Sequence, residues 1–218
     1  MFQTNPFTLI VLLVGLSLVA FVAMIATSYL KIVVVMSLIR NALGIQSIPP
    51  NMVLNALAMM LTFYILAPHC SEAWNILREQ AGDQPTQSLQ VEAVAKAGEP
   101  FREWLSTHTA DRERAFFVQT AERLWAQPDG TPAVVDPESF AILIPSFCVS
   151  ELTKAFQIGF LVYLPFIAID IIVSNILLAM GMMMVSPVTI SLPFKLLLFV
   201  MADGWTLLIQ GLVRGYAQ

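Results

Sequence analysis

The chain has 218 residues, of which 57% are hydrophobic and 12% charged, with a formal net charge of −4 and a mean hydropathy of +0.75. Soluble globular domains carry about 25% charged residues, so an ordinary soluble domain is excluded, and we expect no nucleic-acid partner for this acidic chain. Uncharged runs are long enough to cross a bilayer as helices. The composition therefore predicts an all-α protein of membrane type.

Residues 1–70 are predicted to form a helical hairpin. No charge precedes Lys31, whereas a cleavable signal peptide has a basic region before its apolar run. We therefore expect an uncleaved first helix that continues through Lys31 toward the hairpin tip. Gly44 suits the position that ends a helix, and Pro49 and Pro50 suit the turn and the start of the second arm.

Residues 71–138 hold most of the charge. Six positive and twelve negative side chains give a balance of −6 here, which leaves +2 for the rest of the chain. Glycines and prolines punctuate the segment, and apolar residues recur at helical spacing between Phe116 and Leu124. We predict a small acidic helical insertion, which is too short for a large core of its own.

Residues 139–218 are predicted to form a second hairpin, with arms at Phe140–Met184 and Pro187–Tyr216. The two hairpins give four apolar segments in all. Pro145 and Pro165 predict a kink or a break in the first arm of this hairpin.

The second hairpin tip contains Met182, Met183 and Met184 ahead of Pro187, which cannot continue a helix. Methionine is flexible and polarizable and fits irregular surfaces. Several copies of such a tip around one axis would form a deformable apolar plug. Packing against lipid or a neighbouring hairpin is the simpler alternative, and the residues alone leave both open.

Five charged residues interrupt the apolar arms of the second hairpin: Glu151, Lys154, Asp170, Lys195 and Asp203. Ionisable groups in apolar spans are costly and face a partner or a wet cavity. All five could form local or interhelical pairs that only hold the fold, and Glu151 and Lys154, three positions apart, can pair on one helix face. An intersubunit pair of Glu151 with Lys195 is the alternative. Either arrangement indicates a hairpin that is buried in a protein complex.

The positive charges also predict a topology. Lys31 and Arg40 near the first tip, and Lys195 near the second, favour tips on the cytoplasmic side. Four spans then place the acidic insertion in the periplasm or outside the cell.

No catalytic, cofactor or metal motif occurs in the sequence. A disulfide between Cys70 and Cys148 competes with the interpretation that both are small buried hydrophobic residues. His69 and His108 are isolated and lack metal-ligand spacing. A phosphate loop, a dinucleotide fingerprint and a nucleophile elbow are all missing, so we expect neither a cofactor nor enzymatic activity.

Several segments together resemble one family. They are SELTKAFQIGF at 150–160, LVYLPF at 161–166, LLAMGMMMVSP at 177–187, LPFKLLLF at 192–199, DGW at 203–205, RNALG at 40–44 and IPPN at 48–51. In these segments the chain is similar to the SctR/FliP family of type III secretion export-apparatus membrane proteins, whereas the insertion carries little of the resemblance. The chain resembles the virulence (injectisome) branch of this family more than the flagellar branch, whose members have a cleavable signal and a longer N-terminus.

The resemblance implies a pentamer-like, helically arranged ring that includes SctS/FliQ-like and SctT/FliR-like small membrane proteins. It also implies that this assembly passes unfolded protein substrates across the bacterial inner membrane, with Met182 to Met184 as a gate and no catalytic residues. The finished ring would be raised toward the periplasm. A topology based on charge then describes only the insertion of a single chain.

Two other classes are compatible with intramembrane charges. A small-solute or ion transporter would place ionisable groups in the broken helices of an internal repeat, but the hairpins show no evident repeat. An intramembrane aspartyl protease would pair Asp170 with Asp203 as carboxylates that share a site, but the Gly-x-Gly-Asp pattern is missing. Purification of the chain as a large oligomer with partner subunits would distinguish an export subunit from a transporter and from a protease.

Overall fold

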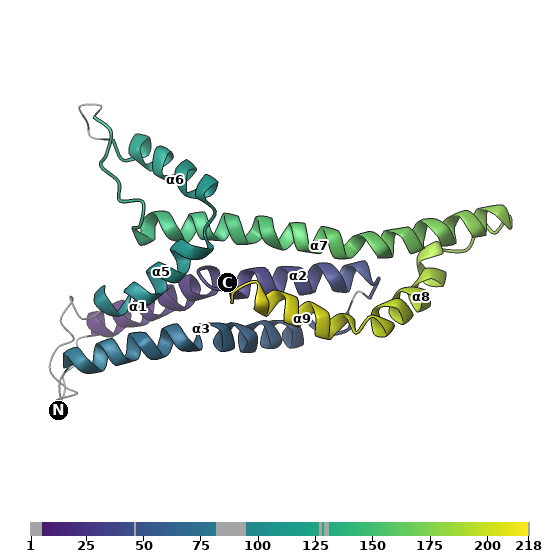
Figure 1. The fold of residues 1–218 in the computed structure, drawn as a ribbon, viewed down its shortest axis with the longest axis horizontal. Coiled ribbons are helices and arrows are strands. Elements are labelled where there is room, and N and C mark those ends of the chain that lie inside the picture. The colour runs from purple at the N-terminus through teal and green to yellow at the C-terminus, as the bar shows by residue number, and fades with distance from the viewer. Residues whose placement is uncertain (1–5, 46, 82–94, 127, 129–130, 218) are drawn as a thin grey trace. The chain divides into compact units, whose positions relative to one another are not determined.

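A computed structural model of the chain describes residues 6–45, 47–81, 95–126, 128 and 131–217. These residues contain helices and no strand, which confirms the all-α prediction. The helices shown in Figure 1 are α1 (Pro6–Ile25), α2 (Tyr29–Ala42), α3 (Asn51–Ala81), α5 (Glu99–His108), α6 (Asp111–Leu124), α7 (Phe140–Ala179), α8 (Pro187–Met201) and α9 (Gly204–Arg214).

The chain forms two compact units. The first contains residues 1–30 and 68–151, and the second contains residues 31–67 and 152–218. The long helices α3 and α7 each contribute to both units, because the unit boundaries fall within them. The second unit holds both predicted hairpin tips.

The first predicted arm consists of two helices. α1 ends at Ile25 and α2 begins at Tyr29, so the expectation of one continuous helix through Lys31 is wrong. Hydroxyl side chains occupy the break: Thr27 Oγ1 accepts the backbone N–H of Tyr29 at 3.4 Å, and Ser28 is fully buried. Serine and threonine favour helix starts because their oxygens bind backbone N–H groups that lack a helical partner.

In the first unit, α5 packs against the beginning of α7. The Trp104 side chain is buried, and its ring centroid lies 5.0 Å from that of Phe147 and 4.9 Å from that of His108. Ser150 Oγ on α7 accepts the N–H of Ala110, just before α6, at 3.0 Å. The acidic insertion is therefore helical, as predicted, and these contacts attach it to α7.

In the second unit, α2 and α3 each bury one stripe of side chains. The fully buried stripe of α2 follows the i, i+3, i+4, i+7 spacing of an amphipathic helix and contains Ile32, Val35, Met36 and Ile39. The buried stripe of α3 repeats every fourth residue and contains Leu54, Ala58, Thr62 and Leu66. α7 approaches α2 closely at Gly159, where a Cβ atom would lie 2.3 Å from Cδ1 of Leu38.

Two helices among the described residues are long and apolar enough to cross a membrane, Asn51–Glu79 and Phe140–Ala179. α8 and α9 make a third if they are taken as one span bent by 58°. The first predicted apolar segment forms α1, and several of its side chains lie outside the described set. α7 is one helix of 40 residues, so neither Pro145 nor Pro165 breaks it.

The last predicted arm is interrupted between α8 and α9. Asp203 adopts the left-handed conformation, with φ 49° and ψ 41°, which is uncommon for a residue other than glycine. A Cβ atom on Gly204 would lie 2.3 Å from the Phe199 ring, so the next position requires glycine. Asp-Gly is a turn signal that the interpretation of one continuous arm overlooked.

Candidate functional site

The methionine tip lies outside the helices that flank it. α7 ends at Ala179 and α8 begins at Pro187, and the exposed fractions of Met182, Met183 and Met184 are 46%, 81% and 100%. The prediction that these residues leave the helix before the proline is confirmed. Whether they form a gate depends on neighbouring chains and stays a prediction.

Backbone hydrogen bonds close the end of α7. Gly181 has φ +72°; its N–H donates to Leu178 O at 3.0 Å, and the N–H of Met182 donates to Leu177 O at 2.9 Å. This pair of bonds around a left-handed glycine is a Schellman motif. A residue with a Cβ atom would strain this conformation, so the glycine sets the direction in which the chain leaves α7.

The first hairpin tip uses the same motif. Gly44 has φ +77°, its N–H donates to Asn41 O at 3.0 Å, and the N–H of Ile45 donates to Arg40 O at 3.3 Å. The predicted helix end at Gly44 is confirmed. The Arg40 guanidinium then fixes the turn by donating to Pro49 O at 3.2 Å and to Asn51 Oδ1.

The two hairpins of the second unit meet close to their tips. A Cβ atom on Gly44 would lie 3.9 Å from side-chain atoms of both Val188 and Leu192, on α8. Pro50 accepts the N–H of Leu54 at 3.2 Å in the first turn of α3, and Pro187 is the first residue of α8. The predicted roles of these prolines at the turn are confirmed.

Lys195 is the centre of a polar cluster in the second unit. Its Nζ lies 2.6 Å from Asp170 Oδ2 and donates to Ala42 O at 3.2 Å. Ser191 Oγ donates to the other carboxylate oxygen of Asp170 at 2.5 Å. The Lys195 side chain is 4% exposed and that of Asp170 is 31% exposed. The cluster joins α8 to α7 and to the C-terminal end of α2.

The remaining predicted charges have different surroundings. Glu151 is fully buried at the end of the first unit, Lys154 is half-buried, and Asp203 is exposed at the α8–α9 break. Lys195 has its counter-charge, Asp170, within its own unit, which is an interhelical pair of the kind expected from the sequence, although the sequence did not identify these two partners. An intersubunit pair of Lys195 with Glu151 stays a prediction, because an ammonium group has three N–H donors and the cluster uses two of them.

Both cysteines are free thiols. Cys70 is exposed, and Cys148 is half-buried and donates its S–H to the carbonyl of Ile25 at 3.1 Å. The alternative of a disulfide is therefore wrong, and so is the expectation that both cysteines are buried. Within the described ranges no cluster of three or more potential ligand side chains could hold a metal ion.

Lys31 has a role that its position in the sequence did not indicate. Its Nζ lies 3.7 Å from the ring centroid of Tyr216, and both residues are buried. A desolvated ammonium over an aromatic face is stabilised by the ring quadrupole. The charge pattern treated Lys31 as a residue that flanks a span, but it lies inside the second unit.

The sequence matches the FliP family over residues 12–212. It is 50% identical over 214 residues to Yop proteins translocation protein R of Yersinia pestis, with 97% of each chain covered. It is 46% identical over 213 residues to hypersensitivity response secretion protein HrcR of Ralstonia nicotianae, with 96% of each chain covered. Flagellar biosynthetic protein FliP of Bacillus subtilis is 40% identical over 209 residues, which are 95% of this chain and 90% of that protein.

Proposed function

Because this chain belongs to the FliP family, we propose that it is a core subunit of a type III secretion export gate. In this role it forms part of an oligomeric pore through which unfolded protein substrates cross the bacterial inner membrane. The relatives named for secretion and translocation are 46% and 50% identical to it, whereas the flagellar relative is 40% identical. These values support the virulence branch of the family.

The observation that carries this proposal is the exposed methionine tip. Three large apolar side chains project from a turn that Gly181 and Pro187 terminate on either side. Burial of a side chain of this size is worth about 1.5–3 kcal/mol, so copies of the tip would stay in contact once other contacts have assembled them around one axis. A ring of methionines would seal an idle pore and still deform around a passing chain.

Neighbouring subunits explain the exposed apolar face of α7. This face includes Phe156, Phe160, Leu161, Ile171, Ile172 and Ile176, each more than half exposed. Lipid could cover such side chains, and so could neighbouring protein chains. We propose that further copies in a pentamer-like ring, together with SctS/FliQ-like and SctT/FliR-like subunits, cover this face.

The site geometry supports transport rather than catalysis. Both carboxylate oxygens of Asp170 are engaged, by Lys195 and by Ser191, so this residue is arranged as an ion pair and not as half of a carboxylate pair with Asp203.

We propose that the acidic insertion lies on the periplasmic side of the inner membrane, and that the finished ring is raised toward the periplasm.

Deletion of the gene and the mass of the extracted complex test the proposal. A strain that lacks this chain should lose export of type III substrates and regain it with the intact gene. In native mass spectrometry of mild-detergent extracts, we expect a homo-oligomer with or without small membrane partners. A dominant species at the 24.1 kDa mass of one chain would contradict the proposal.

A further inference from the structure

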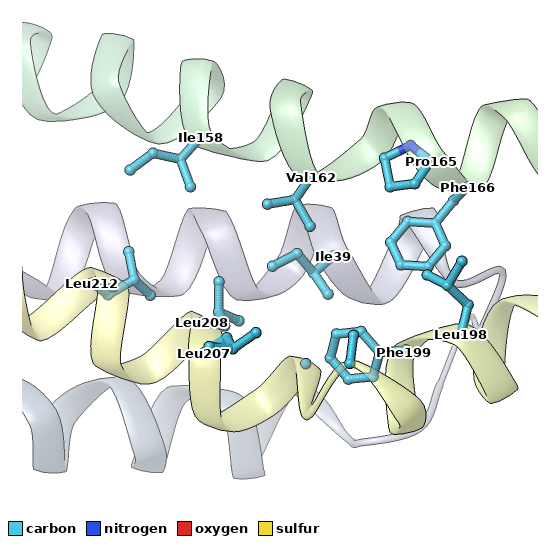
Figure 2. A pocket seen from close by; sticks show the side chains of 13 residues that line it. Ile39, Ile158, Val162, Pro165, Phe166, Leu198, Phe199, Leu207, Leu208 and Leu212 are labelled. Atoms are coloured by element: carbon cyan, nitrogen blue, oxygen red, sulfur yellow. The ribbon is translucent and has the colours of Figure 1, made fainter.

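An apolar cavity lies beside the α8–α9 break, within the second unit. It has a volume of about 430 Å³, which is in the range of small-molecule sites. Figure 2 shows Ile158 and Val162 of α7 on the side of the cavity toward Leu208 of α9. Phe166 lies at the other end, where its ring centroid is 6.4 Å from that of Phe199 on α8. Every side chain that lines the cavity is apolar, so an occupant receives no side-chain hydrogen bond there.

A second cavity adjoins the first and differs in its polarity. It has a volume of about 370 Å³, and it shares Phe199 and Gly204 with the apolar cavity. Arg40 and Asp203, which carry opposite charges, both line it. The two cavities therefore border each other at Phe199 and Gly204, and an elongated ligand laid across these two residues would reach both an apolar and a zwitterionic end.

Both charged groups retain binding capacity. Arg40 uses its Nη1 for Pro49 O and Asn51 Oδ1, whereas its Nη2 makes no hydrogen bond with a described residue and is not among the buried atoms without a partner. The Asp203 carboxylate likewise makes no hydrogen bond or ion pair with any described side chain. Hydrogen bonds between charged groups are stronger than those between neutral ones, so a ligand anion at the Arg40 Nη2 would be stabilised.

We propose that this site binds one zwitterionic phospholipid whose headgroup carries a primary amine. The phosphate would accept hydrogen bonds from Arg40, the ammonium would face Asp203, and an acyl chain would fill the apolar cavity. The charge pattern of the headgroup matches the opposite charges at the polar end. A lipid that carries only negative charge would instead be repelled by Asp203.

The size of the apolar cavity favours an acyl chain over a helix of another subunit. A helix about 10 Å across with a 5.4 Å pitch occupies roughly 420 Å³ per turn, so the cavity holds no more than one turn. An acyl chain is thin and unbranched and has no polar atoms to satisfy. A side chain inserted from a neighbouring subunit is the competing occupant.

The first test fills the cavity. Gly211 lines it, and a Cβ atom at Gly211 would meet nothing within 4 Å. Gly211→Leu can therefore place its Cβ atom without a clash and extend its side chain into the lipid's space, and leucine is the better helix former. Gly15→Leu is the matched control, because Gly15 also lies within a helix, has open space for a Cβ atom and is remote from the cavity in sequence.

The full chain, with any partners that co-purify, is delipidated and titrated with palmitoyl-oleoyl phosphatidylethanolamine or phosphatidylglycerol. Native mass spectrometry then counts the bound lipids. We expect the parent and Gly15→Leu to bind one phosphatidylethanolamine at least about tenfold more tightly than phosphatidylglycerol, as one charge-assisted hydrogen bond would give. Gly211→Leu should lose this binding. Equal affinities for both lipids in the parent, or undiminished binding by Gly211→Leu, would overturn the proposal.

A second variant keeps the proposal testable if Gly211→Leu does not fold. Asp203→Asn preserves the left-handed conformation, which asparagine tolerates, but removes the charge that faces the amine. Its preference for phosphatidylethanolamine should disappear. A photo-crosslinking residue at Gly211 identifies the occupant in cells: a lipid adduct supports the proposal, and an adduct with another subunit refutes it.

Discussion

The Lys195–Asp170 pair gives a stability prediction whose magnitude follows from burial. Removing one partner of a buried ion pair costs about 3–5 kcal/mol. Asp170 is 31% exposed and can be partly rehydrated, so we expect Lys195→Met to lower the free energy of unfolding by about 2–3 kcal/mol. At about 2–4 °C per kcal/mol for a chain of this size, Tm should fall by about 4–12 °C.

A double-mutant cycle isolates the pair. Asp170→Asn keeps an oxygen that can accept the hydrogen bond of Ser191 but removes the charge, and the double variant Asp170→Asn with Lys195→Met leaves no charge in the cluster. Thermal unfolding of the full chain in mild detergent, followed by circular dichroism, measures each variant. We expect a coupling energy of about 1.5–3 kcal/mol, which is typical of hydrogen bonds between charged groups. If Lys195→Met lowers the free energy of unfolding by the same amount with aspartate and with asparagine at position 170, the pair does not stabilise the fold.

Three further predictions concern assembly, gating and helix packing. Lys195→Glu should reduce oligomer formation, and adding Glu151→Lys should restore part of it if these residues pair between subunits; native mass spectrometry measures this. Replacement of Met182, Met183 and Met184 by alanine should leave assembly intact but let ions leak across the inner membrane, which conductance measurements detect. Gly159→Ala should lower stability by about 1–3 kcal/mol in thermal unfolding, because its Cβ would overlap an atom of a neighbouring helix.

Controls separate these effects from general damage. Alanine at Leu196, Leu197 and Leu198 should impair assembly without a specific leak. A methionine variant that assembles, stays ion-tight and secretes at the parental rate would show that the methionines are not the gate. If Lys154→Glu rescues Glu151→Lys and Lys195→Glu does not, then Glu151 pairs with Lys154 on its own helix and not with Lys195 of another subunit.

The hairpin tips could be predicted from the sequence because short-range chemistry determines them. Gly44 ends a helix because it can adopt a left-handed conformation, and Pro187 begins one because its fixed φ suits the first helical position. Both effects act within a few residues. The exposure of Met182 to Met184 in the single chain follows from the same local turn.

The polar cluster could not be predicted, because it depends on how distant segments pack. Lys195 and Asp170 are 25 positions apart and meet only in the register that the hairpin adopts. The break between α1 and α2 was also missed, and the sequence left open whether Pro145 kinks α7 or breaks it. A proline or hydroxyl residue changes the free energy of continuing a helix by an amount comparable with packing energies. Tertiary contacts therefore decide whether the helix continues, kinks or ends there.

The Schellman closure at Gly181 makes the methionine loop self-supporting. The hydrogen bonds that shape it join only backbone atoms between Leu177 and Val185, so the fold of the loop does not depend on hydrogen bonds from the side chains at positions 182 to 184. Substitutions there would change the width and hydrophobicity of the proposed gate without refolding the loop. The side chains of the proposed gate could therefore differ between bacteria, and with them its width, while the supporting helices stay the same.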